Sequence, residues 1–204
     1  MKYLDASDKI AEYRAQIADL RQKMRALQTD REPEEVKDYA FATTSEPVHL
    51  SELFGDRDDL ILIHNMGKAC GACTLWADGF NGIYHHLVDR AAFVVTSPDE
   101  PNVQQAFAQG RGWRFPMASH RDTTFAADMG YGSKGAWKPG VSVFKREPTR
   151  IVRVSDTGFR PGDDFCTMWH FLDLFPGGYG GWMPKFDYGN PAGKRAVPSC
   201  CSDH

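Results

Sequence analysis

Apolar side chains recur at helical spacing near the start of the chain, between Ser7 and Leu27. They follow one another at intervals of 3, 4, 3, 4 and 3 residues: Ile10, Tyr13, Ile17, Leu20, Met24 and Leu27. This spacing predicts an amphipathic helix with a heptad-like seam, which ends at Asp30, Glu32 and Pro33. Three roles are open for such a narrow seam: packing on the helix's own domain, pairing with a second copy as a homodimer, or acting as a lid.

Beyond this helix, the pattern alternates between strand-like and helix-like segments. The unbroken apolar run from Leu60 to Asn65 is typical of a buried strand. Further strands are expected at residues 91–96, 141–145 and 150–154, and helices at 74–89, 102–109, 124–129 and 163–175. The early alternation predicts parallel strands with crossover helices, and the last two strands are close enough to form a hairpin. We therefore expect an α/β fold with a mixed central sheet covered by helices on both faces.

These segments divide the chain into three parts. Residues 1–32 form the N-terminal amphipathic helix, and residues 33–176 form the α/β domain. Glycine and proline dominate residues 177–204, where we expect a poorly ordered tail.

Composition narrows the class of protein. The chain has 204 residues, 42% of them hydrophobic, which is enough for one domain with a core. A net charge of −3 does not favour binding to nucleic acid. The sequence has neither an apolar leader nor a stretch that spans a membrane, so we expect a cytoplasmic protein with no membrane partner. Cytoplasmic cysteines are mostly reduced, and a total of five leaves at least one unpaired within a monomer.

The candidate chemistry lies in Cys70-Gly71-Ala72-Cys73, which follows the predicted buried strand and begins the next helix. A helix N-terminus offers free N–H groups and a positive dipole end, and both stabilise a thiolate. Lys68 is expected to act in the same direction. Cys70 is therefore the candidate nucleophile. Cys73, one helical turn later, would resolve a mixed disulfide.

Zinc sites use the same CxxC spacing, but usually with a second spaced pair of ligands. The other pair here, Cys200-Cys201, is adjacent rather than spaced. With His204 it is a candidate site for a soft metal, and the same thiols are candidates to shuttle electrons to the CxxC. A tail without function is the other alternative. No cofactor is expected.

The order of elements, with CGAC at the first strand–helix junction, resembles the thioredoxin fold. The segment Lys138-Pro139-Gly140-Val141-Ser142-Val143-Phe144 is similar to that family's proline-plus-strand segment. The resemblance implies a cis bond at Pro139 and a position facing the CxxC. The segments Ala91–Asp99 and Trp113–Pro116 resemble the peroxiredoxin-like branch, which joins such segments by a helix.

The resemblance is greatest to a bacterial domain-of-unknown-function family with a thioredoxin-like fold. The matching segments are Cys70–Phe80, Pro139–Phe144 and Trp169–Leu174, and the similarity extends over residues 35–176. This resemblance implies the fold more firmly than it implies the reaction.

Several positions depart from the thioredoxin pattern. Ala69 stands where thioredoxins carry an aromatic residue, so the usual platform for partners is altered. His64 stands where they carry a buried acid. Its imidazole is either a base that accepts the Cys73 proton or a histidine simply satisfied at the strand end. The peroxidase branch expects threonine three residues before its reactive cysteine, where this chain has Gly67, and this disfavours a peroxidase.

We therefore predict a dithiol–disulfide oxidoreductase that acts on a protein or small-molecule disulfide or thiol. Lys68, Trp76, Lys138 and Pro139 are the candidate substrate-binding residues, although an aromatic at helical spacing such as Trp76 is more often part of a core. A thiol peroxidase and a non-catalytic module that binds a metal or a partner are the alternatives.

Overall fold

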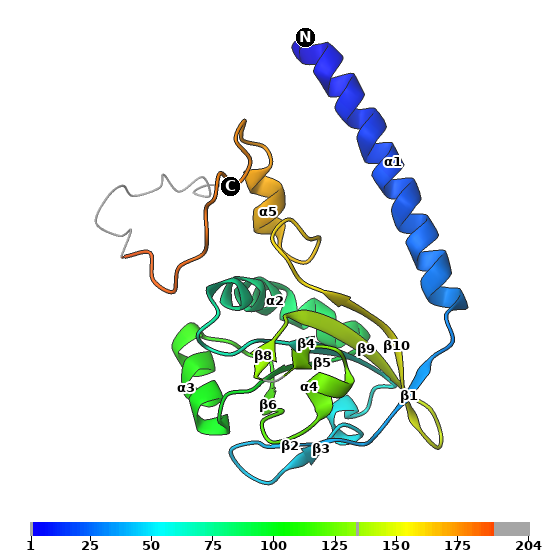
Figure 1. Ribbon diagram of the computed structural model, residues 1–204, viewed down its shortest axis with the longest axis vertical. Coiled ribbons are helices and arrows are strands. Elements are labelled where there is room, and N and C mark those ends of the chain that lie inside the picture. Colours follow the sequence, from blue (N-terminus) through cyan, green and yellow to red (C-terminus); the bar gives the residue numbers. More distant parts are fainter. Residues whose placement is uncertain (1, 134, 190–204) are drawn as a thin grey trace, which may run out of the picture.

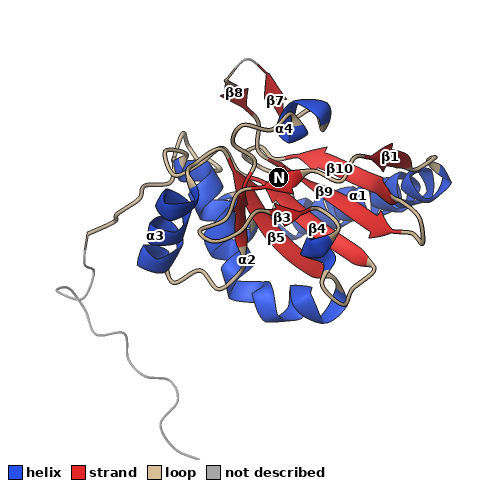
Figure 2. Ribbon diagram, turned by 90° about the horizontal axis from the view of Figure 1, so that it is seen from below, coloured by secondary structure: helices blue, strands red, loops and turns tan. Residues whose placement is uncertain are grey.

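The computed structural model describes residues 2–133 and 135–189. Within them a mixed sheet has the strand order β1-β10-β9-β4-β5-β6 (Figure 2). Its strands are β1 (Glu34–Val36), β4 (Asp59–His64), β5 (Ala92–Ser97), β6 (Met117–Ser119), β9 (Gly140–Arg146) and β10 (Ile151–Gly158). β4, β5 and β6 are parallel, and β9 is antiparallel to both β4 and β10. The predicted mixed sheet is confirmed.

Helices link and cover these strands. The longer ones are α1 (Tyr3–Asp30), α2 (Gly71–Arg90) and α3 (Pro101–Arg111), and the shorter ones are α4 (Phe125–Asp128), α5 (Thr167–Leu172) and the 3-10 helix η1 (Glu52–Phe54). Two small hairpins pair β2 (Ala40–Phe41) with β3 (Val48–His49) and β7 (Gly132–Ser133) with β8 (Ala136–Trp137). None of the helices in the described ranges is both long and apolar enough to cross a membrane.

The sheet has a core on each face because side chains alternate along β4. Leu60 and Leu62 join the cluster that contains Phe125 of α4 and Phe54 of η1. Ile63 joins the other cluster, which is built from α2, α3 and α5 and has these central members: Trp76, Phe80, Phe93 and Trp169. α2 and α4 therefore cover opposite faces of the sheet, as expected.

The N-terminal helix α1 extends away from the sheet (Figure 1). It buries none of its residues, and even the seam residue Ile17 is 47% exposed. An ion pair joins Arg21 to Asp164 in the segment before α5. Packing of the seam on its own domain was one possible role, and the structure does not show it. Pairing of α1 with a second copy stays a prediction.

The segment after α5 is better packed than the sequence predicts. We expected poor order from residue 177 onward, yet Trp182 packs edge-on against Trp169 with ring centroids 6.0 Å apart. The orange segment in Figure 1 turns back toward α2 and α3 as far as Gly189. A few large aromatic side chains in this segment make its apolar contacts, and its glycine-rich composition gave no indication of them.

Candidate active site

Cys70 is the N-cap residue of α2. Its backbone is extended (φ −93°, ψ 103°), and its Sγ accepts a hydrogen bond from the backbone N–H of Cys73 at 3.0 Å. A thiol at this position satisfies one of the free N–H groups with which every helix begins. The Cys70 side chain is partly exposed, whereas Cys73 is buried in the first turn. The structure thus brings together the two cysteines that the sequence singled out, with only one accessible to a partner.

The two thiols shift each other's pKa in opposite directions. A hydrogen bond from the Cys73 thiol is the main cause that lowers the pKa of Cys70, to about 7; the N–H groups of Cys73 and Ala72 add to it, against burial. The same hydrogen bond, burial and the Cys70 charge raise the pKa of Cys73. The predicted contribution of the helix N-terminus is present. Lys68 is exposed, and its predicted effect on Cys70 stays a prediction.

The loop between β4 and α2 is held by polar side chains. Asn65 accepts a hydrogen bond from Gly67 N–H at 2.8 Å, and Asp99 accepts one from Lys68 N–H at 2.7 Å. Gly67 has φ +99°, and a Cβ there would lie 2.9 Å from the Asp99 carboxylate. Only glycine fits this position. The sequence analysis missed the role of Asn65 and Asp99. The one indication in the sequence was their position, because Asn65 directly follows β4 and Asp99 lies two residues after β5.

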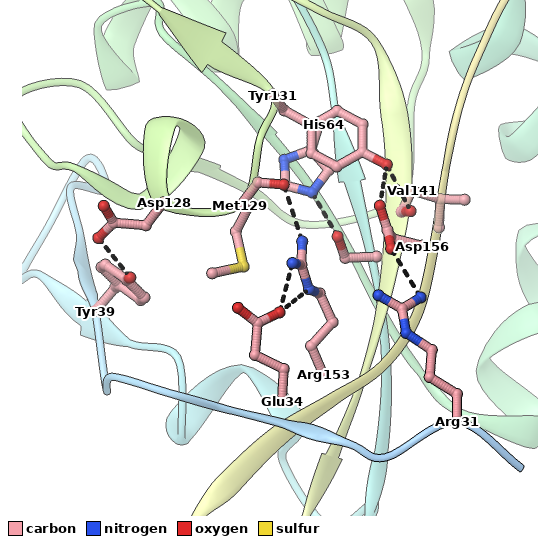
Figure 3. A network of polar contacts seen from close by, with 11 residues as sticks. Arg31, Glu34, Tyr39, His64, Asp128, Met129, Tyr131, Val141, Arg153 and Asp156 are labelled. Carbon is pink, nitrogen blue, oxygen red and sulfur yellow. Dashed lines mark hydrogen bonds and ion pairs between the residues drawn. The ribbon is translucent and has the colours of Figure 1, made fainter. Parts of the chain in front are cut away.

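His64 does not reach the cysteines. Its Nε2 lies 2.8 Å from Ser142 Oγ, and its ring stacks on Tyr131 with centroids 3.9 Å apart (Figure 3). Because strand side chains alternate, His64 points to the α4 face while its neighbour Ile63 points to the α2 face. Burial holds the pKa of His64 well below its ordinary value. The proposal that His64 accepts the Cys73 proton was wrong. His64 is a buried histidine at the strand end whose Nε2 contacts Ser142, while its Nδ1 has no hydrogen-bond partner among the described residues.

Pro139 precedes β9 at the expected place but not in the expected isomer. Gly140 pairs with His64 across the sheet, so Pro139 lies at the edge from which the CxxC loop leaves β4. The peptide bond before Pro139 is trans, which corrects the cis bond implied by the thioredoxin resemblance. Lys138 is exposed, and its backbone N–H donates to Tyr131 O at 2.9 Å.

Trp76 is a core residue. It is 2% exposed, and its Nε1–H donates to Asp163 at 3.2 Å. It therefore lines no groove in this structure, and the substrate-binding role considered for it was wrong. The apolar surface next to the CxxC loop is instead a shallow groove along α3 beside Lys68, with a volume of about 370 Å³, lined by Asn102, Val103, Ala106 and Phe107.

Residues 182–188, which we call the strap, lie against the start of α2. A Cβ added at Gly71 would come within 3.1 Å of Pro184 O and 4.0 Å of the Phe186 ring. The Phe186 carbonyl accepts a hydrogen bond from Arg111 at 3.3 Å. The glycine after Cys70 is thus explained by close approach of the strap. Sequence reasoning missed this contact because it treated the segment as an unpacked tail.

Metal binding finds no support in the described part of the chain, which contains no cluster of three or more histidine, cysteine or acidic side chains able to hold an ion. The predicted soft-metal candidates Cys200, Cys201 and His204 lie outside the described residues.

A mixed sheet whose central strand leads into a helix with an accessible, low-pKa thiol at its N-terminus defines a thioredoxin-like or peroxiredoxin-like protein. The chain belongs to a particular family of that class, the bacterial proteins of unknown function DUF899, whose sequence pattern matches residues 2–188. The family resemblance read from the sequence is confirmed. No match was found among curated proteins.

The solved structures that are similar to this one include peroxiredoxins. The peroxidoxin BcpB of Mycobacterium tuberculosis is 25% identical, with a TM-score of 0.50, over 60% of this chain and 84% of that chain. Reduced Prx3 of Vibrio vulnificus in complex with hydrogen peroxide is 12% identical, with a TM-score of 0.54, over 65% of this chain and 90% of that one. The second likeness shows the fold alone. Both structures confirm the predicted fold class, and the likeness to the peroxidoxin BcpB supports a thiol-based redox role.

Proposed function

We propose that the protein is a dithiol–disulfide oxidoreductase in which Cys70 is the nucleophile and Cys73 the resolving thiol. One observation carries the proposal: the partly exposed Cys70 Sγ caps α2 and accepts the Cys73 N–H at 3.0 Å, with the buried Cys73 one turn into the same helix. This arrangement lowers the pKa of Cys70 to about 7 and raises that of Cys73. At neutral pH about half of Cys70 is then thiolate, whereas an ordinary cysteine near 8.5 is only a few per cent ionised.

The reaction balances with these two sulfurs alone. The Cys70 thiolate attacks one sulfur of a substrate disulfide, forms the mixed disulfide and expels the other sulfur as a thiolate. Cys73 then loses its proton to that thiolate and attacks Cys70 Sγ, which forms the Cys70–Cys73 disulfide and releases the second substrate thiol. The Cys73 pKa falls at this stage, because the negative charge that held its proton is gone. No histidine base is required.

Titration of Cys70 tests this function most directly. We expect the rate of Cys70 alkylation by iodoacetamide to rise with pH, with the midpoint of the rise near pH 7. We also expect the protein to reduce insulin disulfides. A Cys73→Ala variant loses the hydrogen bond that is the main cause of the shift, so its midpoint should rise toward 8.5. A midpoint of 8.5 or more in the unaltered protein, with no exchange with dithiols, would exclude the proposal. Stoichiometric metal uptake in that case would instead identify a non-catalytic module.

A thiol peroxidase is the second candidate, and the similarity to a peroxidoxin favours it. The Cys70 thiolate would attack a peroxide oxygen, releasing water or an alcohol and leaving a sulfenic acid that Cys73 condenses to a disulfide with loss of water. We expect any consumption of hydrogen peroxide with a dithiol reductant to disappear in Cys70→Ser. Turnover of insulin without consumption of peroxide would exclude this candidate.

A further inference from the structure

An apolar surface begins directly beside Cys70. The shallow groove along α3 includes Lys68, which precedes Cys70 by two residues, so the Cα atoms of these two lie within about 7 Å of each other. Val103, Ala106 and Phe107 give the groove its apolar character, and Ala106 is exposed. Apart from Lys68, the described residues that line the groove are uncharged. A partner that reaches Cys70 therefore meets an uncharged, apolar neighbourhood.

The strap extends this surface on the other side of Cys70. Phe186 packs edge-on against Phe107, with ring centroids 6.4 Å apart. A Cβ on Gly71, the residue after Cys70, would lie 4.0 Å from the Phe186 ring. Arg111 donates a hydrogen bond to the Phe186 carbonyl at 3.3 Å and holds the strap here, yet the Phe186 side chain is 47% exposed. Rings from two separate segments thus lie beside the nucleophile, and neither is fully buried.

This surface suits an extended polypeptide better than a small molecule. Sites for small molecules enclose most of their ligand and fix it with several polar groups. The groove is shallow, and only Lys68 and Asn102 among its described residues have side chains that form hydrogen bonds. Attack on a disulfide brings the substrate sulfur to about 2 Å from Cys70 Sγ. Residues that flank the substrate cysteine span about 3.4 Å each, so one or two of them reach the groove.

We propose that the substrate is a disulfide in a polypeptide, and that an apolar side chain next to the substrate cysteine packs on Phe107 and Phe186. This inference rests on the proposed dithiol–disulfide activity and adds its substrate class. The exchange at the sulfurs is the one described above for Cys70 and Cys73. An apolar side chain leaves water when it packs on the rings, which raises kcat/KM for such a disulfide relative to one with a polar neighbour.

Two matched peptides test the proposal on the full chain. Each is closed by a disulfide, and they differ only in whether phenylalanine or serine precedes the first cysteine. The second-order rate constant for oxidation of the reduced protein by each peptide is divided by that for the same peptide with reduced glutathione, which removes differences in intrinsic reactivity. In the unaltered protein we expect the corrected constant to be about tenfold larger for the phenylalanine peptide, since partial burial of one aromatic side chain corresponds to roughly that factor.

Two variants should reduce this ratio. Ala106→Glu puts a carboxylate into the groove and should bring the ratio to about 1, while Phe186→Ala removes one ring and should bring it to about 3. Ala106 is exposed on α3, where glutamate is a good helix former. The matched control is Gln105→Glu, which adds the same charge at the neighbouring exposed position outside the groove and should keep the ratio. A new carboxylate also affects the reactivity of Cys70, but this effect is common to both peptides and cancels in the ratio.

The results distinguish this inference from the proposed function. If the two peptides have equal corrected constants, or if either groove variant keeps the tenfold ratio, the inference fails and the proposed function stands. Loss of the ratio in Gln105→Glu also overturns the inference, because charge alone then explains it. A dimer lost in Ala106→Glu but kept in Gln105→Glu, measured by sedimentation, would assign the groove to a second copy of the chain instead. If neither peptide oxidises the protein, the proposed function fails and the inference fails with it.

Discussion

The Cys70→Ser variant should lose reduction of insulin disulfides by a factor on the order of 10³ or more, to the rate of the uncatalysed reaction. A serine hydroxyl is not ionised near neutral pH, so the hydrogen bonds that stabilise the Cys70 thiolate have no anion to stabilise. Those bonds come from Cys73 and the first N–H groups of α2. Turnover measured with a constant excess of dithiol gives the comparison.

Cys73→Ser should also stop turnover, but at a later step. Its Cys70 remains a nucleophile, because the introduced serine hydroxyl can still donate a hydrogen bond, and a mixed disulfide with the substrate should accumulate to about one per chain. The matched control is Cys166→Ala, since Cys166 is buried at the start of α5 and packs with Trp169. It should retain the turnover of the unaltered protein. Equal turnover by Cys70→Ser and the unaltered protein would assign the chemistry to another group.

The unequal roles of the two cysteines could be predicted from the sequence because they depend on local order. An apolar run, a CxxC and an amphipathic helix in succession already place Cys70 at a helix N-terminus, and the structure agrees. Ranges such as residues 91–96 and 102–109 likewise match β5 and α3 within a few positions. These features arise from periodicity within one segment, which a sequence displays directly.

Features that depend on contacts between distant segments were harder to predict. His64 was assigned by its distance from Cys70 in the thioredoxin pattern, although the apolar run before it contains no sign of which face it occupies. β1 (Glu34–Val36) is a short, polar edge strand that pairs with β10 of the β9–β10 hairpin. Its own three residues do not indicate that partner. The strap was missed because glycine and proline surround the two aromatic residues that hold it, Trp182 and Phe186.

The histidines of the α4 face should make the protein sensitive to acid. His64 and His120 are 1% and 2% exposed, and neither His64 Nδ1 nor either ring nitrogen of His120 has a hydrogen-bond partner among the described residues. Arg153, which pairs with Glu34 near His64 in Figure 3, adds positive charge on this side. Burial lowers the pKa of His120 to about 4 and holds that of His64 well below its ordinary value. Both imidazoles are thus neutral in the folded protein at pH 7.

Stability should therefore fall as the pH drops from about 6.5 to about 4. In this window the unfolded chain binds protons at both positions and the folded protein does not, so protonation favours unfolding. A shift from 6.5 to about 4 at His120 alone corresponds to about 3 kcal/mol, at 1.36 kcal/mol per pKa unit.

Urea unfolding at pH 7.5 and pH 4.5 measures the difference. A His120→Gln variant should lose much of this pH dependence even if it is less stable at pH 7.5. If the His120→Gln and unaltered proteins lose the same free energy between the two pH values, His120 is not the group that carries the effect.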